Sequence, residues 1–174
     1  EDDQLTFEVA EKLKKITKAQ GNSFVFKASF DKANRSSLDS YRGPGLKKGL
    51  EIFKELRKSD YQLITDVHEI SQVEKISEVV DIIQIPAFLC RQTDLIKEAC
   101  QAGKPMNIKK GQFLSPDQMK NIIEKCNNFG NDQVMLCERG TSFGYDNLVV
   151  DMLGMSKLKS FNCPIIFDVT HSLQ

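Results

Sequence analysis

The sequence lacks an excess of either charge and lacks a long apolar run. Its 174 residues include 24 Lys and Arg and 24 Asp and Glu, so the formal net charge is zero. General nucleic-acid-binding proteins carry a basic excess, and a membrane span needs roughly 18 or more apolar residues in succession. The acidic start EDDQLTFEVA has no signal-peptide apolar region. We therefore expect a protein that binds neither nucleic acid nor a membrane.

Cysteine and histidine are scarce. The five cysteines are odd in number and no two form a CxxC pair, which argues against a disulfide framework and a thiolate zinc site. Reduced thiols in a cytoplasmic protein are expected instead. With two histidines, His68 and His171, a mechanism that needs several imidazoles is not expected.

Apolar runs alternate with amphipathic stretches along the chain. Helices are predicted over 5–19, 42–59, 70–80, 93–102, 115–126 and 146–160. Strands are predicted over 23–30, 62–68, 81–88, 105–111, 133–140 and 164–172. The length is that of one domain, 1–174. Strands that are continuous apolar runs separated by helices predict an α/β protein with a parallel sheet covered by helices.

Two architectures fit this order, an open doubly wound sheet and a closed TIM (β/α)8 barrel. The sequence has no glycine-rich dinucleotide or P-loop fingerprint that would favour the open sheet. Nearly every predicted strand ends in polar residues, whereas an open sheet concentrates them near one switch point. Barrel sites collect at the carboxyl ends of many strands, so the barrel is favoured.

The predicted barrel is incomplete. The chain shows about six β/α units where a closed barrel has eight strands. It begins on a helix and stops just after a strand, so we expect a domain truncated at both ends, without the first and last strands. An open arc should result, with a gap between 23–30 and 164–172. Interior residues there, such as Phe26 and Ile166, should lose neighbours.

Several cations stand at the predicted strand ends. They are Lys27, Lys32, Lys109 and Arg139, with Arg35 as a fifth. Mixed with hydroxyl and amide donors, they suit one or two small anionic ligands. Two alternatives stay open: the loop after Lys27 is simply solvated, or Lys109 pairs with a structural carboxylate such as Glu138 or Asp168.

The remaining polar groups have a functional and a structural interpretation each. His68 and His171 follow two strands, where an imidazole can act as acid, base or metal ligand, or can be a hydrogen-bonded structural residue. Gln84 and the backbone around Ala87 can donate to an anion. Arg91 lies farther out, where it reaches a partner subunit or makes a surface ion pair.

Seven motifs together resemble those of the 3-deoxy-D-manno-octulosonate 8-phosphate synthases. In chain order they are KASFDKANRSS, RGPG, TDVHE, QIPAFLCRQTDL, NIKKGQF, ERGTSFGYDNLVVDM and FDVTHSLQ. The resemblance covers about 5–174 and implies a barrel transferase of lipopolysaccharide (KDO) biosynthesis. The implied reaction joins phosphoenolpyruvate to arabinose 5-phosphate and releases phosphate.

The resemblance also implies roles for individual residues. Phosphoenolpyruvate contacts are implied for Lys27, Ser29, Lys32, Gln84, Ala87, Lys109 and Arg139. Arabinose 5-phosphate contacts are implied for Asn34, Arg35 and Ser36, and for Arg91 in a neighbouring subunit, which implies a homotetramer. Asp66 and His171 would line the reacting centre, beside Lys109 and Arg139, as catalytic residues.

The family has metal-dependent and metal-independent branches, and the branch stays open. His171 would be a ligand of a divalent metal if the chain belongs to the metal-dependent branch. Two other functions also stay open. One is a phosphate-ligand-binding fragment without catalysis, and the other is a sister synthase that uses erythrose 4-phosphate.

Overall fold

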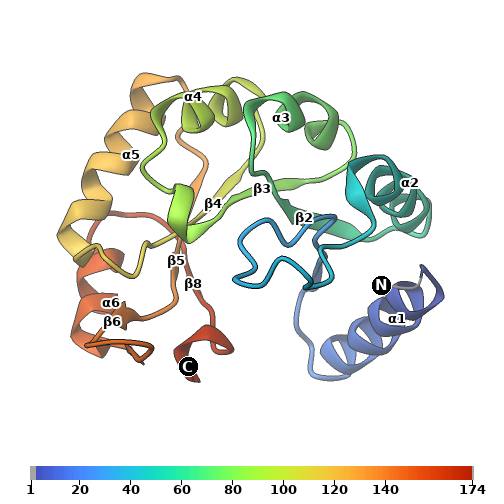
Figure 1. The fold of residues 1–174 in the computed structure, drawn as a ribbon, viewed down its shortest axis with the longest axis horizontal. Helices are drawn as coiled ribbons and strands as arrows, with labels where there is room; N and C mark the ends of the chain where they lie inside the picture. Colours follow the sequence, from blue (N-terminus) through green and yellow to red (C-terminus); the bar gives the residue numbers. More distant parts are fainter. Residues whose placement is uncertain (1–2, 174) are drawn as a thin grey trace.

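A parallel sheet that curls into an arc organises the computed structural model, which describes residues 3–173 (Figure 1). Its strands are β1 (Val25–Lys27), β2 (Gln62–Asp66), β3 (Ile82–Ile85), β4 (Met106–Lys109), β5 (Val134–Glu138) and β8 (Ile165–Phe167). The helices are α1 (Asp3–Ala19), α2 (Gly45–Lys58), α3 (Ile70–Ser77), α4 (Thr93–Gln101), α5 (Met119–Asn128) and α6 (Met152–Lys159). Short 3-10 helices are η1 (Ala87–Leu89), η2 (Pro116–Gln118) and η3 (His171–Leu173). The predicted alternation of strand and helix is confirmed.

The order of the strands identifies the architecture. It runs β1-β2-β3-β4-β5-β8, and every neighbouring pair is parallel. A doubly wound sheet would reverse its order at a switch point, whereas this order follows the chain throughout. Helices α2 to α6 follow the convex side of the arc (Figure 1). The fold is therefore an incomplete TIM-type barrel, as predicted, with β1 and β8 at the two edges of the described sheet.

The convex face of the sheet packs against the helices and forms the core. Successive side chains of a strand point to opposite faces, and the register aligns the core residues across the strands. The fully buried members on the strands are Leu63, Ile83, Ile85, Met106, Ile108 and Leu136. From the helices they meet Phe53, Leu56, Ile76, Ile96, Met119 and Ile122. The other face of each strand is thereby directed to the concave side.

The expected loss of neighbours at the open edges is right for one residue and wrong for another. Ile166 on β8 is only half-buried. Phe26 on β1, however, is 5% exposed. It aligns with Leu63 on the convex face and contacts Phe24 and Tyr61. On β8, by contrast, Phe167 lies on the convex face and is still 39% exposed, so closeness to an edge reduces burial there, whereas Phe26 is covered by its aromatic neighbours.

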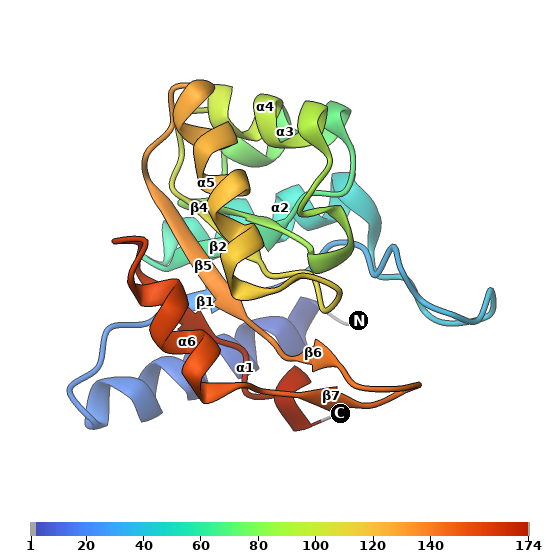
Figure 2. The ribbon, with the colours of Figure 1, turned by 90° about the vertical axis from the view of Figure 1, so that its left-hand side faces the viewer.

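The predicted helix over 146–160 is wrong in its first part. Residues Thr141–Ser142 (β6) and Leu148–Val149 (β7) form an antiparallel hairpin, which extends from the end of β5 (Figure 2). Helix α6 begins after Asp151, whose side chain accepts a hydrogen bond from the backbone N–H of Leu153 at 2.9 Å. Asp151 is thus the N-cap of α6, and the helix begins later than the apolar spacing of 146–160 predicts.

A helix that spans a membrane needs about 20 consecutive, mostly apolar residues. No helix within residues 3–173 is both long enough and apolar enough to cross a membrane.

Candidate functional site

Asp66, at the end of β2, anchors the first half of the site. Its Oδ2 lies 2.7 Å from the Lys27 Nζ and accepts a hydrogen bond from the Ser29 hydroxyl at 2.9 Å. Burial raises the pKa of Asp66, but the charge of Lys27 and hydrogen bonds from Lys27, Gln84 and Ser29 outweigh it and hold that pKa below its usual value. Asp66 is therefore ionised at neutral pH and holds the Lys27 ammonium in place.

A row of amides continues from Asp66 across the concave face. Gln84 donates to the other carboxylate oxygen of Asp66 and accepts from Asn107 Nδ2 at 2.8 Å. The three residues are in register on β2, β3 and β4, and all three are buried. Asn107 and Lys109 are two residues apart on β4, so they share this face. The row thus links the end of β1 to the end of β4.

Lys109, Asp168 and His171 form the second half. The Lys109 ammonium is paired with Asp168 Oδ2, and His171 Nδ1 lies 2.6 Å from the same oxygen. Burial raises the pKa of Asp168, but hydrogen bonds from Lys109 and the His171 backbone, with the Lys109 charge, bring it to about 2. Burial and the Lys109 charge lower the pKa of His171 despite the opposing effect of Asp168. Of the two partners left open for Lys109, the structure selects Asp168.

Arg139 follows β5 and is 8% exposed. Its Nε is buried and has no hydrogen-bond partner among the described residues. A buried guanidinium nitrogen without an acceptor is costly unless a ligand supplies one. Arg139 is therefore a donor that a bound anion can satisfy.

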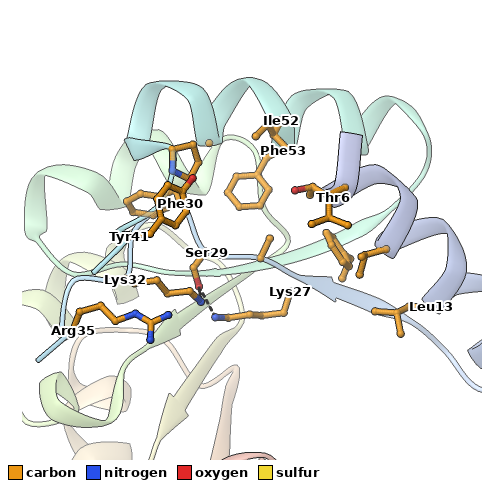
Figure 3. Close-up of a pocket in the computed structure, with 17 residues that line it drawn as sticks. Thr6, Leu13, Lys27, Ser29, Phe30, Lys32, Arg35, Tyr41, Ile52 and Phe53 are labelled. Atoms are coloured by element: carbon orange, nitrogen blue, oxygen red, sulfur yellow. Dashed lines mark hydrogen bonds between the residues drawn. The ribbon is translucent and has the colours of Figure 1, made fainter. Parts of the chain in front are cut away.

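A cavity of about 330 Å³ opens beside Lys27 and Ser29, between α1, β1 and α2. Lys27, Ser29, Lys32 and Arg35 line one side of it, and Lys32 Nζ donates to the Ser29 hydroxyl at 3.1 Å. Arg35 points toward Lys27 and Lys32 (Figure 3). The sequence-predicted cations of 27–35 are thus gathered at one rim.

The loop that carries Arg35 is closed at its base. Arg42 donates from two nitrogens to the two carboxylate oxygens of Asp31, at 2.8 and 2.5 Å. Next to it, Gly43 has a φ of +122°, and a Cβ there would lie 2.5 Å from the Phe30 carbonyl oxygen. Asn34 and Ser36 lie exposed in this loop, and neither lines the cavity.

Two other predicted contacts lie on the segment after β3. Ala87 is buried at the start of η1. Arg91 is exposed, and its backbone carbonyl accepts a hydrogen bond from Lys125 Nζ at 3.3 Å. The described residues do not bring the Arg91 side chain to either group of site residues, the one around Asp66 or the one around Asp168.

The two histidines differ in their surroundings. His68 lies edge-on to Phe30, with ring centroids 5.7 Å apart, and burial lowers its pKa. Its ring Nδ1 is buried and has no hydrogen-bond partner among the described residues, so the structure does not show the hydrogen-bonded structural residue that was one interpretation of His68. Within residues 3–173 no three His, Cys, Asp or Glu side chains gather as a metal site would require. The described residues around His171 therefore do not by themselves make up a metal-binding set.

Sequence reasoning missed the pair Lys110 and Glu138. Their side chains lie 3.4 Å apart and are 0% and 3% exposed, on the convex side of the sheet. The signal was present in the dipeptides Lys109-Lys110 and Glu138-Arg139. Since neighbouring strand residues face opposite sides, one member of each had to be buried among the helices.

The fold and the cations at the carboxyl ends of the strands define a class of protein. It is a barrel-type α/β protein whose parallel sheet gathers cationic side chains at its carboxyl end. The chain belongs to the DAHP synthetase I family, whose sequence model matches residues 1–174. It is 58% identical over 171 residues to a 2-dehydro-3-deoxyphosphooctonate aldolase of Hahella chejuensis, covering 98% of this chain and 61% of that protein.

Two further proteins of the same name have a similar identity to this chain and a similar coverage. That of Mannheimia haemolytica is 62% identical over 169 residues, with 95% of this chain and 60% of the relative covered. That of Desulfotalea psychrophila is 59% identical over 175 residues, with 100% and 62% covered. These names confirm the resemblance to the octulosonate synthases. The chain spans about 60% of the length of these relatives.

Proposed function

We propose that the chain carries the substrate-binding edge of a transferase that condenses phosphoenolpyruvate with D-arabinose 5-phosphate. The products are 3-deoxy-D-manno-octulosonate 8-phosphate and inorganic phosphate. The observation that carries this is the row of cationic groups on the concave face, from Lys27 to Arg139, in a chain without net charge. The name shared by relatives at 57–62% identity supports the same reaction.

Each substrate has a matching group of residues. Lys109 and Arg139 bind the phosphate or carboxylate of phosphoenolpyruvate together with Lys27 and Lys32, while Gln84 and the backbone at Ala87 add donors. Asp66 and Asp168 hold two of these ammonium groups in fixed places before substrate arrives, which lowers the cost of ordering them on binding.

Arabinose 5-phosphate takes the rim formed by the loop after β1. Arg35 holds its phosphate by two parallel hydrogen bonds, as a guanidinium can, and Asn34 and Ser36 contact the sugar. The exposure of Arg91 supports a contact with the sugar phosphate of a neighbouring subunit. A homotetramer and a cytoplasmic location are parts of this proposal.

The chemistry forms one carbon–carbon bond and one carbon–oxygen bond, the latter from water, and breaks the carbon–oxygen bond between C2 and the phosphate; the proton that the water loses balances the proton that the aldehyde oxygen gains. C3 of phosphoenolpyruvate attacks the sugar aldehyde while water adds at C2, and the resulting hemiketal phosphate loses phosphate. His171 is suited to accept the proton of that water. Its lowered pKa keeps it neutral, and with Nδ1 donating to Asp168 its Nε2 carries the free electron pair. In a metal-dependent enzyme His171 would instead be one ligand of a divalent ion, which would supply Lewis-acid chemistry at the site.

Phosphate release tests this function. The chain is incubated with phosphoenolpyruvate and arabinose 5-phosphate, and in parallel with erythrose 4-phosphate or with no sugar. We expect release only with arabinose 5-phosphate. Binding of phosphoenolpyruvate without release would favour the non-catalytic binding fragment, and a preference for erythrose 4-phosphate would favour the sister synthase. If the chain neither binds phosphoenolpyruvate nor releases phosphate, the site itself is contradicted.

A further inference from the structure

Lys110 and Glu138 are buried charges that the proposed chemistry does not use. Lys110 is 0% exposed and Glu138 is 2% exposed. Taking both charges out of water is expensive, and an apolar pair of similar volume often stabilises a fold as well or better. Stability alone is therefore a weak explanation of why the pair is there.

The hydrogen bonds of the pair converge on the end of β5. Glu138 Oε1 accepts from the backbone N–H of Arg139 at 2.8 Å and of Gly140 at 2.7 Å. Lys110 Nζ donates to the carbonyl oxygen of Gly140 at 3.3 Å and to the Thr141 hydroxyl at 3.0 Å. The three residues that leave β5 are thus held by one buried carboxylate and one buried ammonium.

The chain needs such support at this point. Gly140 has a φ of +98°, outside the conformations of a continuing strand, and β6 begins at the next residue. The turn determines where the Arg139 side chain emerges on the concave face. Because Lys110 follows Lys109 directly, the same pair also ties the end of β4 to this turn.

We propose that Lys110 and Glu138 are positioning residues that set the place of Arg139, and through β4 that of Lys109, from beneath the sheet. This deepens the function proposed above and rests on it. Glu138 acts as an acceptor for two backbone N–H groups, and Lys110 neutralises the carboxylate and secures the first residues of the hairpin. Neither residue touches substrate.

Two double variants separate positioning from folding. Removing one charge alone would leave the other buried and unpaired, which endangers the fold. Lys110→Met with Glu138→Gln removes both charges but keeps a side-chain oxygen that accepts from Arg139 and Gly140. Lys110→Met with Glu138→Leu removes both charges and that acceptor. The two variants share every other loss, so their comparison isolates the acceptor.

We expect the two double variants to melt within a few degrees of each other. In the Leu variant, amide exchange at Arg139 and Gly140 should be at least tenfold faster than in the Gln variant, and affinity for phosphoenolpyruvate should be at least tenfold lower. Equal amide exchange in the two variants would overturn the proposal, as would equal affinity for phosphoenolpyruvate. Amide exchange is measured without substrate, so its outcome does not depend on the proposed function. If the wild type fails in the phosphate-release assay, the proposed function is rejected and the positioning proposal is still tested by amide exchange.

Discussion

Lys109 and Asp168 are 59 residues apart in the sequence and form an ion pair across the concave face, from β4 to the end of β8. Strand β5 lies between these two strands in the sheet. The side chains are 13% and 17% exposed, so the pair is screened far less than a surface pair. The pair brings Lys109, Asp168 and, through Asp168, His171 to one place.

Replacing this carboxylate should weaken the fold in a pH-dependent way. The folded-state pKa of Asp168 is about 2, below its unfolded value of about 3.9. Its stabilisation is therefore complete above about pH 5 and is lost as the pH falls toward 2. Asp168→Asn should lower the free energy of unfolding by about 2 kcal/mol at pH 7, and this difference should shrink steadily below pH 4.

Urea unfolding of wild type and variant between pH 7 and pH 2.5 measures that difference. Asp39→Asn, a change at an exposed aspartate of the loop after β1, is the matched control and should show a small difference at every pH. A difference for Asp168→Asn that stays constant with pH would mean that the ion pair with Lys109 does not carry the effect.

Arg139→Met should separate binding from stability. Loss of a charge-assisted contact should cost roughly 1.5–3 kcal/mol of phosphoenolpyruvate affinity, about a tenfold to hundredfold rise in the dissociation constant. Because the Nε of Arg139 is buried without a partner among the described residues, its removal should leave the melting temperature unchanged or slightly higher.

Calorimetric titration and thermal melting check both parts of this prediction. Lys97→Met is the control, because Lys97 is an exposed lysine on α4, and it should change neither quantity. Unchanged phosphoenolpyruvate affinity in the Arg139 variant would remove Arg139 from the site.

Arg35→Lys should act on the sugar phosphate. A lysine cannot supply the two parallel hydrogen bonds of a guanidinium, so the apparent Michaelis constant for arabinose 5-phosphate should rise severalfold, and that for phosphoenolpyruvate much less. Initial rates with each substrate varied in turn give the two constants. Equal rises in both would assign Arg35 to the shared cationic rim and not to the sugar phosphate.

The ion pair between Asp31 and Arg42 should limit the opening of the loop between them. Asp31→Asn removes the charge that accepts both guanidinium hydrogen bonds, and an exposed pair of this kind makes only a small contribution to stability. Trypsin should therefore cleave after Lys32 or Arg35 about two to five times faster in the variant than in wild type.

The double variant Asp31→Arg with Arg42→Asp restores the pair with its charges exchanged. It should bring cleavage at Lys32 and Arg35 back toward the wild-type rate. Cleavage that stays as fast as in Asp31→Asn would show that the backbone contacts at the loop base, and not the ion pair, keep the loop closed.

The order of helices and strands could be predicted because its signal is local. Apolar periodicity and caps lie within a few residues of the element that they define, as with Ser115, which forms a capping box with Gln118 at the start of η2. The hairpin at 141–149 escaped this reasoning, since its short strands pair with each other and leave no apolar pattern of their own.

The sequence by itself determined which residues stand at the strand ends, and from the resemblance of its motifs the family to which they belong. Only the tertiary structure decided their partners. It paired Lys109 with Asp168, placed Lys110 beneath the sheet with Glu138, and left Arg139 without an acceptor among the described residues. The reason is that strand order and register bring together side chains from distant parts of the chain. Both depend on how the strands pair with one another, so no single segment of the sequence determines them.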